Sequence, residues 1–294
     1  MKTINLKINN KNIRVTTWGK PSNEPIVFFH GLGGTSLSCI EIAEKLDRNY
    51  YIVSLDLPGH GKTEQFDTEE EFEIQNIIPW INRIVSQLVN GKHHIIAHSW
   101  GADLALHYMN QFPDDINKIV LLDGGYHDKE TSNKYFTEYN ENNLDNQISS
   151  MEEEIEYYLN DFDNYIFESL DEAVDTELRN YDRKSKLLEI ATNDLIKCED
   201  GKFKWHATGQ TAKFAVMSMY KNPTRNVYHM INDNVLLLHC SLSVKGYMTD
   251  YRKLLIDKIK NNSSIKTVMI ENSGHMVHWD NPQEVTKEIL NFIV

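Results

Sequence analysis

Six short segments that are apolar on consecutive positions constrain the fold of this chain more than any other feature. A half-buried strand alternates apolar and polar residues, whereas a strand covered on both faces is apolar throughout, as in a parallel sheet. Stretches with helical spacing of apolar residues lie between several segments, for example over residues 77–88. Strand followed by helix, repeated, predicts an α/β fold with a doubly wound, mostly parallel sheet. The segments begin at residues 25, 50, 93, 118, 234 and 266 and read PIVFFHG, YYIVSLDLPG, HHIIAHS, KIVLLDGG, NVLLLHC and KTVMIENSGH.

Two departures from this pattern define the expected domain organisation. Residues 4–19 alternate apolar and polar side chains around Asn9-Asn10, which predicts an antiparallel hairpin at the edge of the sheet. Residues 126–232 are acidic and rich in Tyr and Phe, with helical periodicity and no convincing parallel strand. Because apolar strands resume directly afterwards, we expect 126–232 to be a helical cap inserted after the sixth strand, and 1–125 and 233–294 to form the core.

Composition excludes several classes of partner. The net charge of −13 repels phosphate backbones and anionic membranes over most of the surface, so no nucleic acid partner is expected. No apolar stretch approaches the roughly 18 residues of a membrane span, and the first residues lack a secretory signal, so a cytoplasmic protein is expected. The three scattered cysteines are expected to be reduced, buried thiols. The histidines lack metal-ligand spacing, so neither a catalytic metal nor another cofactor is expected. The oligomeric state stays open.

Ser99 stands where a strand pattern changes into a helical one. It follows HHIIAH and precedes WGADLALHYM, with the small residues Ala97 and Gly101 on either side. A sharp strand-to-helix turn needs small neighbours because the strand and the helix approach closely there. In an open α/β sheet, ligands bind beyond the carboxyl ends of the strands, so Ser99 lies where a reactive side chain is expected.

Several motifs in order resemble the α/β-hydrolase superfamily, in particular its capped serine hydrolases of the esterase and C–C hydrolase type. Residues 97–101, Ala-His-Ser-Trp-Gly, are similar to the nucleophile elbow G-x-S-x-G, with alanine in place of the first glycine. FFHGLGGT at 28–35 resembles the His-Gly loop of the family, and LDLPGHGKT at 55–63 resembles its Asp-x-Pro-Gly-x-Gly turn. NSGHMVHWDNPQEV at 272–285 resembles the Gly-His segment before the last helix.

The resemblance implies a role for each matching residue. Ser99 would be the nucleophile and His275 the base, since a serine hydroxyl needs an imidazole to take its proton at neutral pH. The N–H groups of Leu32 and Trp100 would form the oxyanion hole, and Gly31 would line the substrate site. His30 and His98 are expected to hold their loops by hydrogen bonds, and His278 to be a packed or surface side chain.

The third member of the triad departs from the commonest family pattern. Ser243 stands where an aspartate is expected after the seventh strand, and serine cannot carry the charge that stabilises an imidazolium. Asp123 ends KIVLLD, a position where some members of the superfamily carry their acid, so it is the predicted orienting carboxylate. A turn-capping role for Asp123 stays open, as do Asp250, Glu271 or no acid at all.

These residues predict a serine hydrolase of carboxylesterase type that cleaves an ester or related acyl bond of a small, apolar molecule. C–C bond hydrolysis and acyl transfer use the same triad and stay open. A hydrolase-like protein that binds or signals with little turnover is the alternative, motivated by the irregular acid position. Four residues of the predicted cap are expected to line the pocket, although packing within the cap would use the same side chains: Trp205, Phe214, Met217 and Tyr220.

Overall fold

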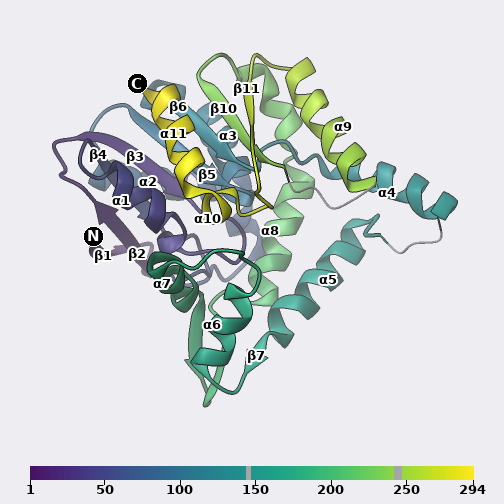
Figure 1. The fold of residues 1–294 in the computed structure, drawn as a ribbon, viewed down its shortest axis with the longest axis horizontal. Helices are drawn as coiled ribbons and strands as arrows, with labels where there is room; N and C mark the ends of the chain where they lie inside the picture. The colour runs from purple at the N-terminus through teal and green to yellow at the C-terminus, as the bar shows by residue number, and fades with distance from the viewer. Residues whose placement is uncertain (144–146, 242–246) are drawn as a thin grey trace.

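The computed structural model describes residues 1–143, 147–241 and 247–294. An eight-stranded sheet forms its centre, in the order β1-β2-β4-β3-β5-β6-β10-β11 (Figure 1). β1 and β2 are antiparallel to their neighbours, and the remaining strands run parallel to one another. The strands are β1 (Lys2–Ile8), β2 (Lys11–Trp18), β3 (Glu24–Phe29), β4 (Tyr50–Leu55), β5 (His93–His98), β6 (Ile116–Leu122), β10 (Val235–Cys240) and β11 (Lys266–Ile270).

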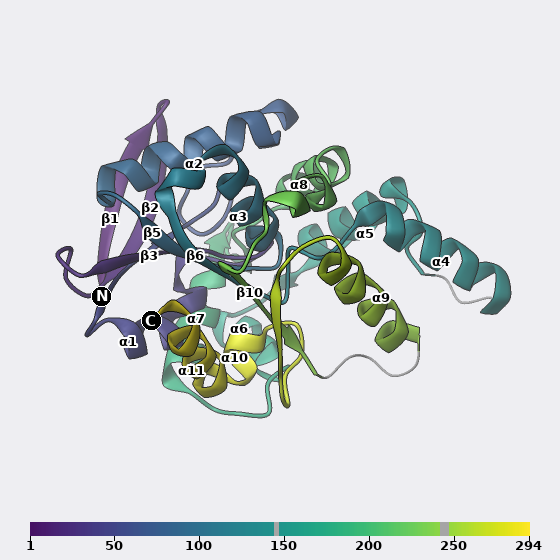
Figure 2. The same ribbon diagram turned by 90° about the horizontal axis from the view of Figure 1, so that it is seen from above.

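Helices cover both faces of this sheet, which confirms the doubly wound α/β prediction (Figure 2). Consecutive residues of a strand point to opposite faces of the sheet, so an all-apolar strand contributes side chains to the hydrophobic core on each face. In β3, Val27 and Phe29 pack in the core under α2, α3 and α9, whereas Ile26 and Phe28 pack in the core under α1 and α11. The helices are α1 (Ile40–Leu46), α2 (Ile74–Leu88), α3 (Trp100–Gln111), α9 (Tyr247–Asn261), α10 (Val277–Asp280) and α11 (Pro282–Ile293), with 3₁₀-helices η1 (Ser36–Cys39), η2 (Glu69–Phe72) and η3 (Pro113–Asp115).

The amino-terminal hairpin is confirmed. β1 and β2 pair from Lys2 opposite Thr17 to Ile8 opposite Lys11, which leaves Asn9 and Asn10 as the two-residue turn. Both asparagines have positive φ, 50° and 65°, as a type I′ turn requires. This turn matches the right-handed twist of the strands and sets the register of the sheet edge.

The segment between β6 and β10, called the insertion below, contains mainly helices and projects from one end of the sheet (Figure 1). It also contains a three-stranded antiparallel sheet, β7-β9-β8, that the sequence pattern did not predict. These strands have two to four residues each, too few to show alternation. The elements are α4 (Lys129–Asn143), α5 (Met151–Asn164), β7 (Ile166–Phe167), α6 (Leu170–Leu178), α7 (Lys186–Leu195), β8 (Ile196–Glu199), β9 (Lys202–Trp205), α8 (Gly209–Lys221) and η4 (Thr224–Met230).

Hydroxyl side chains begin four of the insertion helices. Each accepts a hydrogen bond from the amide three residues later, which satisfies a donor that the first turn of a helix leaves free. The local sequence therefore determines where these helices start, even though it does not determine what they pack against. The capping residues are Ser150 for α5, Ser169 for α6, Ser185 for α7 and Thr208 for α8.

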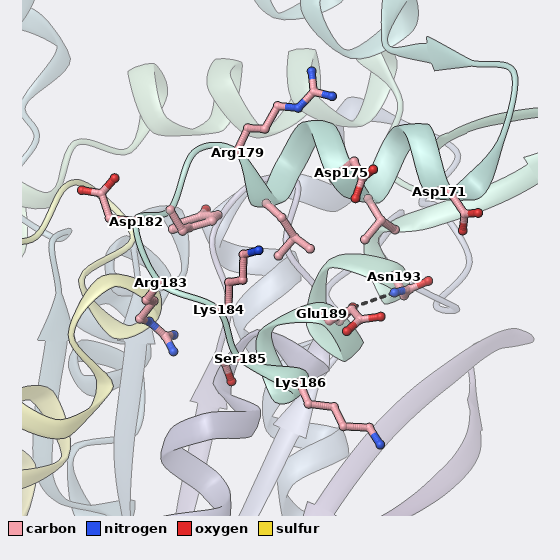
Figure 3. A pocket seen from close by; sticks show the side chains of 13 residues that line it. Asp171, Asp175, Arg179, Asp182, Arg183, Lys184, Ser185, Lys186, Glu189 and Asn193 are labelled. Carbon is pink, nitrogen blue, oxygen red and sulfur yellow. Dashed lines mark hydrogen bonds between the residues drawn. The ribbon is translucent and has the colours of Figure 1, made fainter.

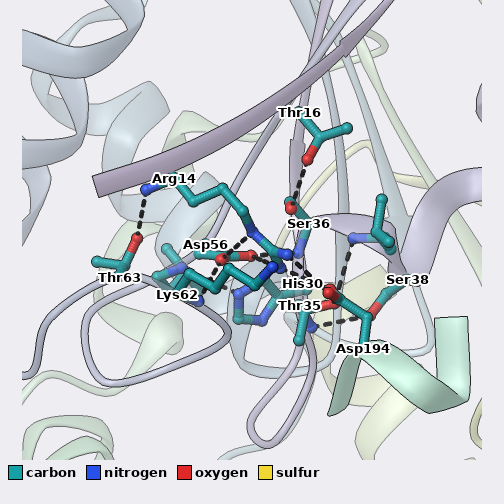
Figure 4. A network of polar contacts seen from close by, with 12 residues as sticks. Arg14, Thr16, His30, Thr35, Ser36, Ser38, Asp56, Lys62, Thr63 and Asp194 are labelled. Carbon is teal, nitrogen blue, oxygen red and sulfur yellow. Dashed lines mark hydrogen bonds and ion pairs between the residues drawn. The ribbon is translucent and has the colours of Figure 1, made fainter. Parts of the chain in front are cut away.

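Buried ion pairs join the insertion to the core. Arg14 of β2 binds the carboxylates of Asp56, after β4, and Asp194 of α7, with N···O distances of 2.5 to 2.9 Å (Figure 4). Thr35 also donates to Asp194, and the backbone N–H of Ser36 donates to Asp56. A residue distant in sequence is thus fixed against the loop that follows β3. Arg183 of the insertion pairs in the same way with Glu41 of α1.

The cysteine prediction is right for two residues and wrong for the third. All three thiols are free, and Cys39 and Cys240 are buried. Cys198 is exposed, because it lies in the short strand β8 at the edge of the small sheet rather than in a core. No helix in the described part of the chain is both long and apolar enough to span a bilayer.

Candidate active site

Ser99 lies at a strained turn between β5 and α3. Its backbone has φ 51° and ψ −122°, a conformation that costs free energy for any residue except glycine. The neighbours enforce it: a Cβ added to Gly101 would meet Phe29 O at 2.5 Å, and one added to Gly124 would meet the Ser99 backbone at similar range. A Cβ added to Gly31 would lie 2.9 Å from the Ser99 Cβ. The turn is therefore possible only because the surrounding positions are small.

The structure brings Ser99, His275 and Asp123 together from three separate turns. His275 Nε2 lies 3.0 Å from Ser99 Oγ, and His275 Nδ1 lies 2.8 Å from Asp123 Oδ2. Asp123 is fully buried after β6, while the imidazole of His275 is 46% exposed. This order of hydroxyl, imidazole and buried carboxylate has the geometry needed for proton transfer from Ser99 to His275.

Asp123 has partners that the sequence did not predict. Arg252 of α9 places one guanidinium nitrogen 2.8 Å from each carboxylate oxygen. The Tyr126 hydroxyl and the Cys240 amide donate to the same carboxylate at 2.9 and 3.1 Å. Burial alone would raise the pKa of Asp123, but the hydrogen bond and charge of His275 and the charge of Arg252 hold that pKa far below its usual range. Asp123 is therefore ionised near neutral pH.

Arg252 was missed because the sequence around it carries no distinctive signal. It lies in a helix with charged residues at many positions, where an arginine is usually solvated. Here its side chain is only 16% exposed and reaches back to the end of β6. The other carboxylates considered for the triad, Asp250 and Glu271, are exposed and do not contact His275. Ser243 lies outside the described residues.

Two backbone amides are available beside Ser99. The N–H groups of Leu32 and Trp100 donate to no acceptor in the described residues, and they flank the nucleophile turn. His30 fixes the loop of Leu32: its Nε2 accepts from the Leu57 amide at 3.0 Å and its Nδ1 donates to Gly31 O at 2.8 Å. These hydrogen bonds fix the loop that carries the Leu32 amide, and the Trp100 amide is fixed at the start of α3, so both are candidate donors to an oxyanion.

Buried imidazoles surround His275. His98 donates from Nε2 to the backbone carbonyl of His275 at 3.1 Å, and its ring lies 4.8 Å from the His275 ring. Burial lowers the pKa of His98 to about 3, and burial holds the pKa of His278 well below its usual value. Both rings therefore stay neutral near pH 7 and leave His275 as the exposed imidazole of this group. His30 and His98 hold loops as predicted, and His278 is packed.

A cavity of about 130 Å³ lies between the core and the insertion, next to the nucleophile turn. Gly31 and Trp205, both predicted to contact substrate, line it, together with Leu32 and His98. The other three residues of the insertion that were predicted to contact substrate lie in α8 and do not line this cavity. Phe214 packs on Phe72 with ring centroids 5.7 Å apart, and Met217 is half-buried. The Tyr220 hydroxyl lies within hydrogen-bond distance of Asn133 and Glu154, at 3.0 and 2.9 Å.

A larger hollow, about 900 Å³, lies on the insertion between α6 and α7 (Figure 3). Its walls are mostly charged side chains, among them the exposed Asp175, Arg179 and Lys186. It shares only Tyr181 with the cavity beside Ser99. The choice of candidate site therefore rests on the strained serine and its imidazole rather than on the size of a hollow. Among the described residues, no three His, Cys, Asp or Glu side chains gather in a way that could hold a metal ion.

The family model of the alpha/beta hydrolase fold matches residues 24–282, so the chain belongs to the alpha/beta hydrolase family. Family membership supports hydrolase chemistry in general. Human serine hydrolase-like protein 2 is 22% identical over 96% of this chain and 90% of that protein. An Acinetobacter baylyi (E)-2-((N-methylformamido)methylene)succinate hydrolase is 26% identical over 42% of this chain, and the match covers 46% of that enzyme.

Solved structures show the same fold at low sequence identity. E-2-(acetamidomethylene)succinate hydrolase superposes with a TM-score of 0.76 at 17% identity, covering 99% of this chain and 98% of that one. A thioesterase domain from the curacin biosynthetic pathway superposes with a TM-score of 0.71 at 18% identity, covering 99% of both chains. The fold predicted from the strand pattern and from the resemblance is thus confirmed.

Proposed function

We propose that this protein is a serine hydrolase that cleaves an ester or related acyl bond of a small molecule through an acyl-enzyme intermediate. The observation that carries the proposal is the continuous chain of contacts from Ser99 Oγ through His275 to the buried carboxylate of Asp123. We also propose that residues 126–232 form a cap over this site. In keeping with the net charge of −13, we propose a cytoplasmic enzyme with no nucleic acid or membrane partner and no cofactor.

In this mechanism, Ser99 Oγ attacks the carbonyl carbon while its proton passes to His275 Nε2. Asp123 accepts from His275 Nδ1–H, so it holds the imidazole in the required tautomer and stabilises the imidazolium. The amides of Leu32 and Trp100 donate to the oxyanion, a contribution of about 3 kcal/mol for each donor in comparable sites. His275 then returns the proton to the leaving group, and a water molecule, deprotonated by the same imidazole, releases the acid and restores Ser99.

The test combines labelling with turnover. A fluorophosphonate probe should label the wild-type protein, Ser99→Ala should abolish labelling, and a panel of 4-nitrophenyl esters should be hydrolysed by the wild type alone. Labelling without turnover would favour acyl transfer to an acceptor other than water, which addition of alcohols or amines would reveal as a new acylated product. A folded wild type that neither labels nor turns over would support the alternative, a ligand-binding protein on a hydrolase scaffold.

A further inference from the structure

Glu177 of α6 is a buried carboxylate in the wall of the cavity beside Ser99. The residue is 7% exposed, and it lines the cavity of about 130 Å³ together with Gly31, Leu32 and His98. His98 precedes Ser99 in sequence, and a Cβ added to Gly31 would lie 2.9 Å from the Ser99 Cβ. A substrate group that fills this cavity therefore contacts both Glu177 and residues beside the nucleophile turn.

Neutral groups hold this carboxylate in place. Trp205 Nε1 donates to Glu177 Oε1 at 3.1 Å, and the Tyr165 hydroxyl makes a second side-chain hydrogen bond. Burial raises the pKa of Glu177, and no basic side chain among the described residues offsets that effect. Arg183, a basic residue close to Glu177 in sequence and only partly exposed, pairs with Glu41 instead of with Glu177. A buried carboxylate without a cation is costly to keep ionised, and an ammonium group bound beside it would favour the ionised form.

The remaining walls suit a small organic cation. Aromatic rings of Trp205, Tyr181 and Trp279 face the cavity, and an ammonium group gains stabilisation from such rings within about 6 Å. The volume is below the range of about 300 to 1,000 Å³ that holds a drug-sized ligand, so the cavity fits a short group rather than a long acyl tail. The net charge of −13 also raises the local concentration of cations around the molecule.

We propose that this cavity binds an alkylammonium group of the substrate, with Glu177 as its counter-ion and the aromatic rings as its walls. The inference rests on the proposed hydrolase function and deepens it, because it assigns a positive charge to a substrate that the apolar residues of the insertion had suggested was uncharged. Glu177 is then a specificity-determining residue: it touches the substrate at a distance from the reacting carbonyl.

A matched pair of esters tests the proposal. 4-Nitrophenyl 3-aminopropanoate and 4-nitrophenyl butanoate have the same number of acyl heavy atoms and differ by one ammonium group. Glu177→Gln keeps the size and the hydrogen-bond acceptor and removes the charge, and Asp175→Asn removes an exposed charge from the same helix. The measured quantity is the ratio of kcat/KM for the two esters in each variant, compared with wild type, which cancels their different intrinsic reactivity. Glu177→Gln should lower that ratio about 10- to 100-fold, as expected for a charge-assisted contact, while Asp175→Asn leaves it unchanged.

A second measurement needs neither turnover nor a variant. Butylammonium should slow fluorophosphonate labelling of wild-type Ser99 at concentrations about tenfold lower than 1-butanol requires, because only the ammonium ion pairs with Glu177. Equal protection by the two compounds, or an ester ratio that Glu177→Gln leaves unchanged, would overturn the cation site. Either result with Ser99 still labelled leaves the hydrolase proposal intact, whereas absent labelling removes both proposals.

Discussion

The core and the insertion differ in how completely they bury their side chains. Every residue of β4 and β5 is buried, and apolar side chains fill both faces of the central sheet. The insertion buries less: none of the residues of α4 is buried, and α7 attaches to the core both through apolar side chains such as Leu188 and through the ion pair of Arg14 with Asp194. Hydrophobic burial scales with area, whereas an ion pair fixes a position through specific groups.

This difference separates the two tasks of an enzyme of this kind. Ser99, His275 and Asp123 all come from turns of the core, where dense packing holds a strained backbone and short hydrogen bonds in place. Glu177 and Trp205, which face the proposed substrate group, come from the insertion. Reaction chemistry and substrate choice are therefore expected to respond to substitutions in different regions.

Ser99→Ala should have the largest effect, because it tests whether the reaction depends on a nucleophile in the core. Removal of the nucleophile of a triad costs about 10⁶-fold in kcat, because the remaining groups act as a unit with it. Ester hydrolysis by purified Ser99→Ala should fall to that extent while the thermal unfolding curve stays unchanged. Ser86→Ala, which removes an exposed hydroxyl, is the control. Residual activity near the wild-type level would place the reactive group elsewhere.

Asp123→Asn should have the next largest effect. An asparagine keeps the shape but favours the wrong imidazole tautomer, which lowers kcat about 10⁴-fold in a comparable triad. The same variant also leaves Arg252 without its carboxylate partner, so a lower unfolding temperature is expected as well. Asp250→Asn, at the exposed alternative position, should retain full activity. A reversal of these two outcomes would reassign the orienting acid.

Asp194→Asn tests the attachment of the insertion. The substitution removes one carboxylate from the buried Arg14 pair, and loss of one partner of such a pair costs about 3 kcal/mol of unfolding free energy. Urea unfolding should show that loss, while Glu189→Gln on the exposed face of the same helix should not. Activity toward a small neutral ester should change little, since the triad lies in the core. Loss of all activity in a folded protein would contradict the division between the regions.

Arg252→Gln should change the pH dependence of the reaction more than its maximum rate. Without the guanidinium, the negative charge of Asp123 is no longer offset and stabilises imidazolium at His275 more strongly. The acid limb of kcat/KM should therefore move to higher pH, with a change of about tenfold or less at the plateau. Lys253→Gln, an exposed neighbour on the same helix, should leave the profile unchanged. A uniform loss at every pH would indicate a purely structural role for Arg252.

The last prediction concerns the stability of the core in acid rather than a single contact. Burial lowers the pKa of His60 to about 4 and that of His98 to about 3, and lowers the pKa of His30 and His278 as well. The unfolded chain then binds more protons than the native one below about pH 6.5, so stability present above that pH is lost as the pH falls.

Each such histidine contributes at most about 1.4 kcal/mol per pH unit to this loss. Urea unfolding at pH 7, 6 and 5 should show a steep decline that His278→Phe makes shallower and that His229→Gln, at an exposed site, leaves unchanged. A flat stability profile between pH 7 and 5 would contradict the burial of these imidazoles.

The strand pattern predicted the core well because its information is local. Each all-apolar segment became a strand, and the residues at the ends of three of these strands or their following turns, Ser99, Asp123 and His275, lie in contact. Parallel strands of one sheet end at a common edge, so a prediction of strand ends is also a prediction of neighbours. The positive φ of Asn9 and Asn10 was likewise readable from the residues themselves.

The insertion was predicted less well because its contacts are distant in sequence. Trp205 lines the cavity beside the nucleophile turn, whereas Phe214 packs on Phe72 and Tyr220 binds Glu154. The residues next to Glu177 in sequence do not distinguish it from the many solvated carboxylates of the same segment. The strands of the small sheet are too short to show a periodic pattern of apolar residues.

The sequence by itself determined the α/β core, the strained turn at Ser99 and the acid-poor segment after the seventh strand, because backbone preference and hydrophobic period act between residues a few positions apart. Only the tertiary structure decided that Arg252 pairs with Asp123 and that Glu177 lines the cavity beside the nucleophile turn with no basic partner among the described residues. Charged side chains have the same local signature whether solvated or buried, and their partners are chosen by the fold, through electrostatic contacts that strengthen only when water is excluded.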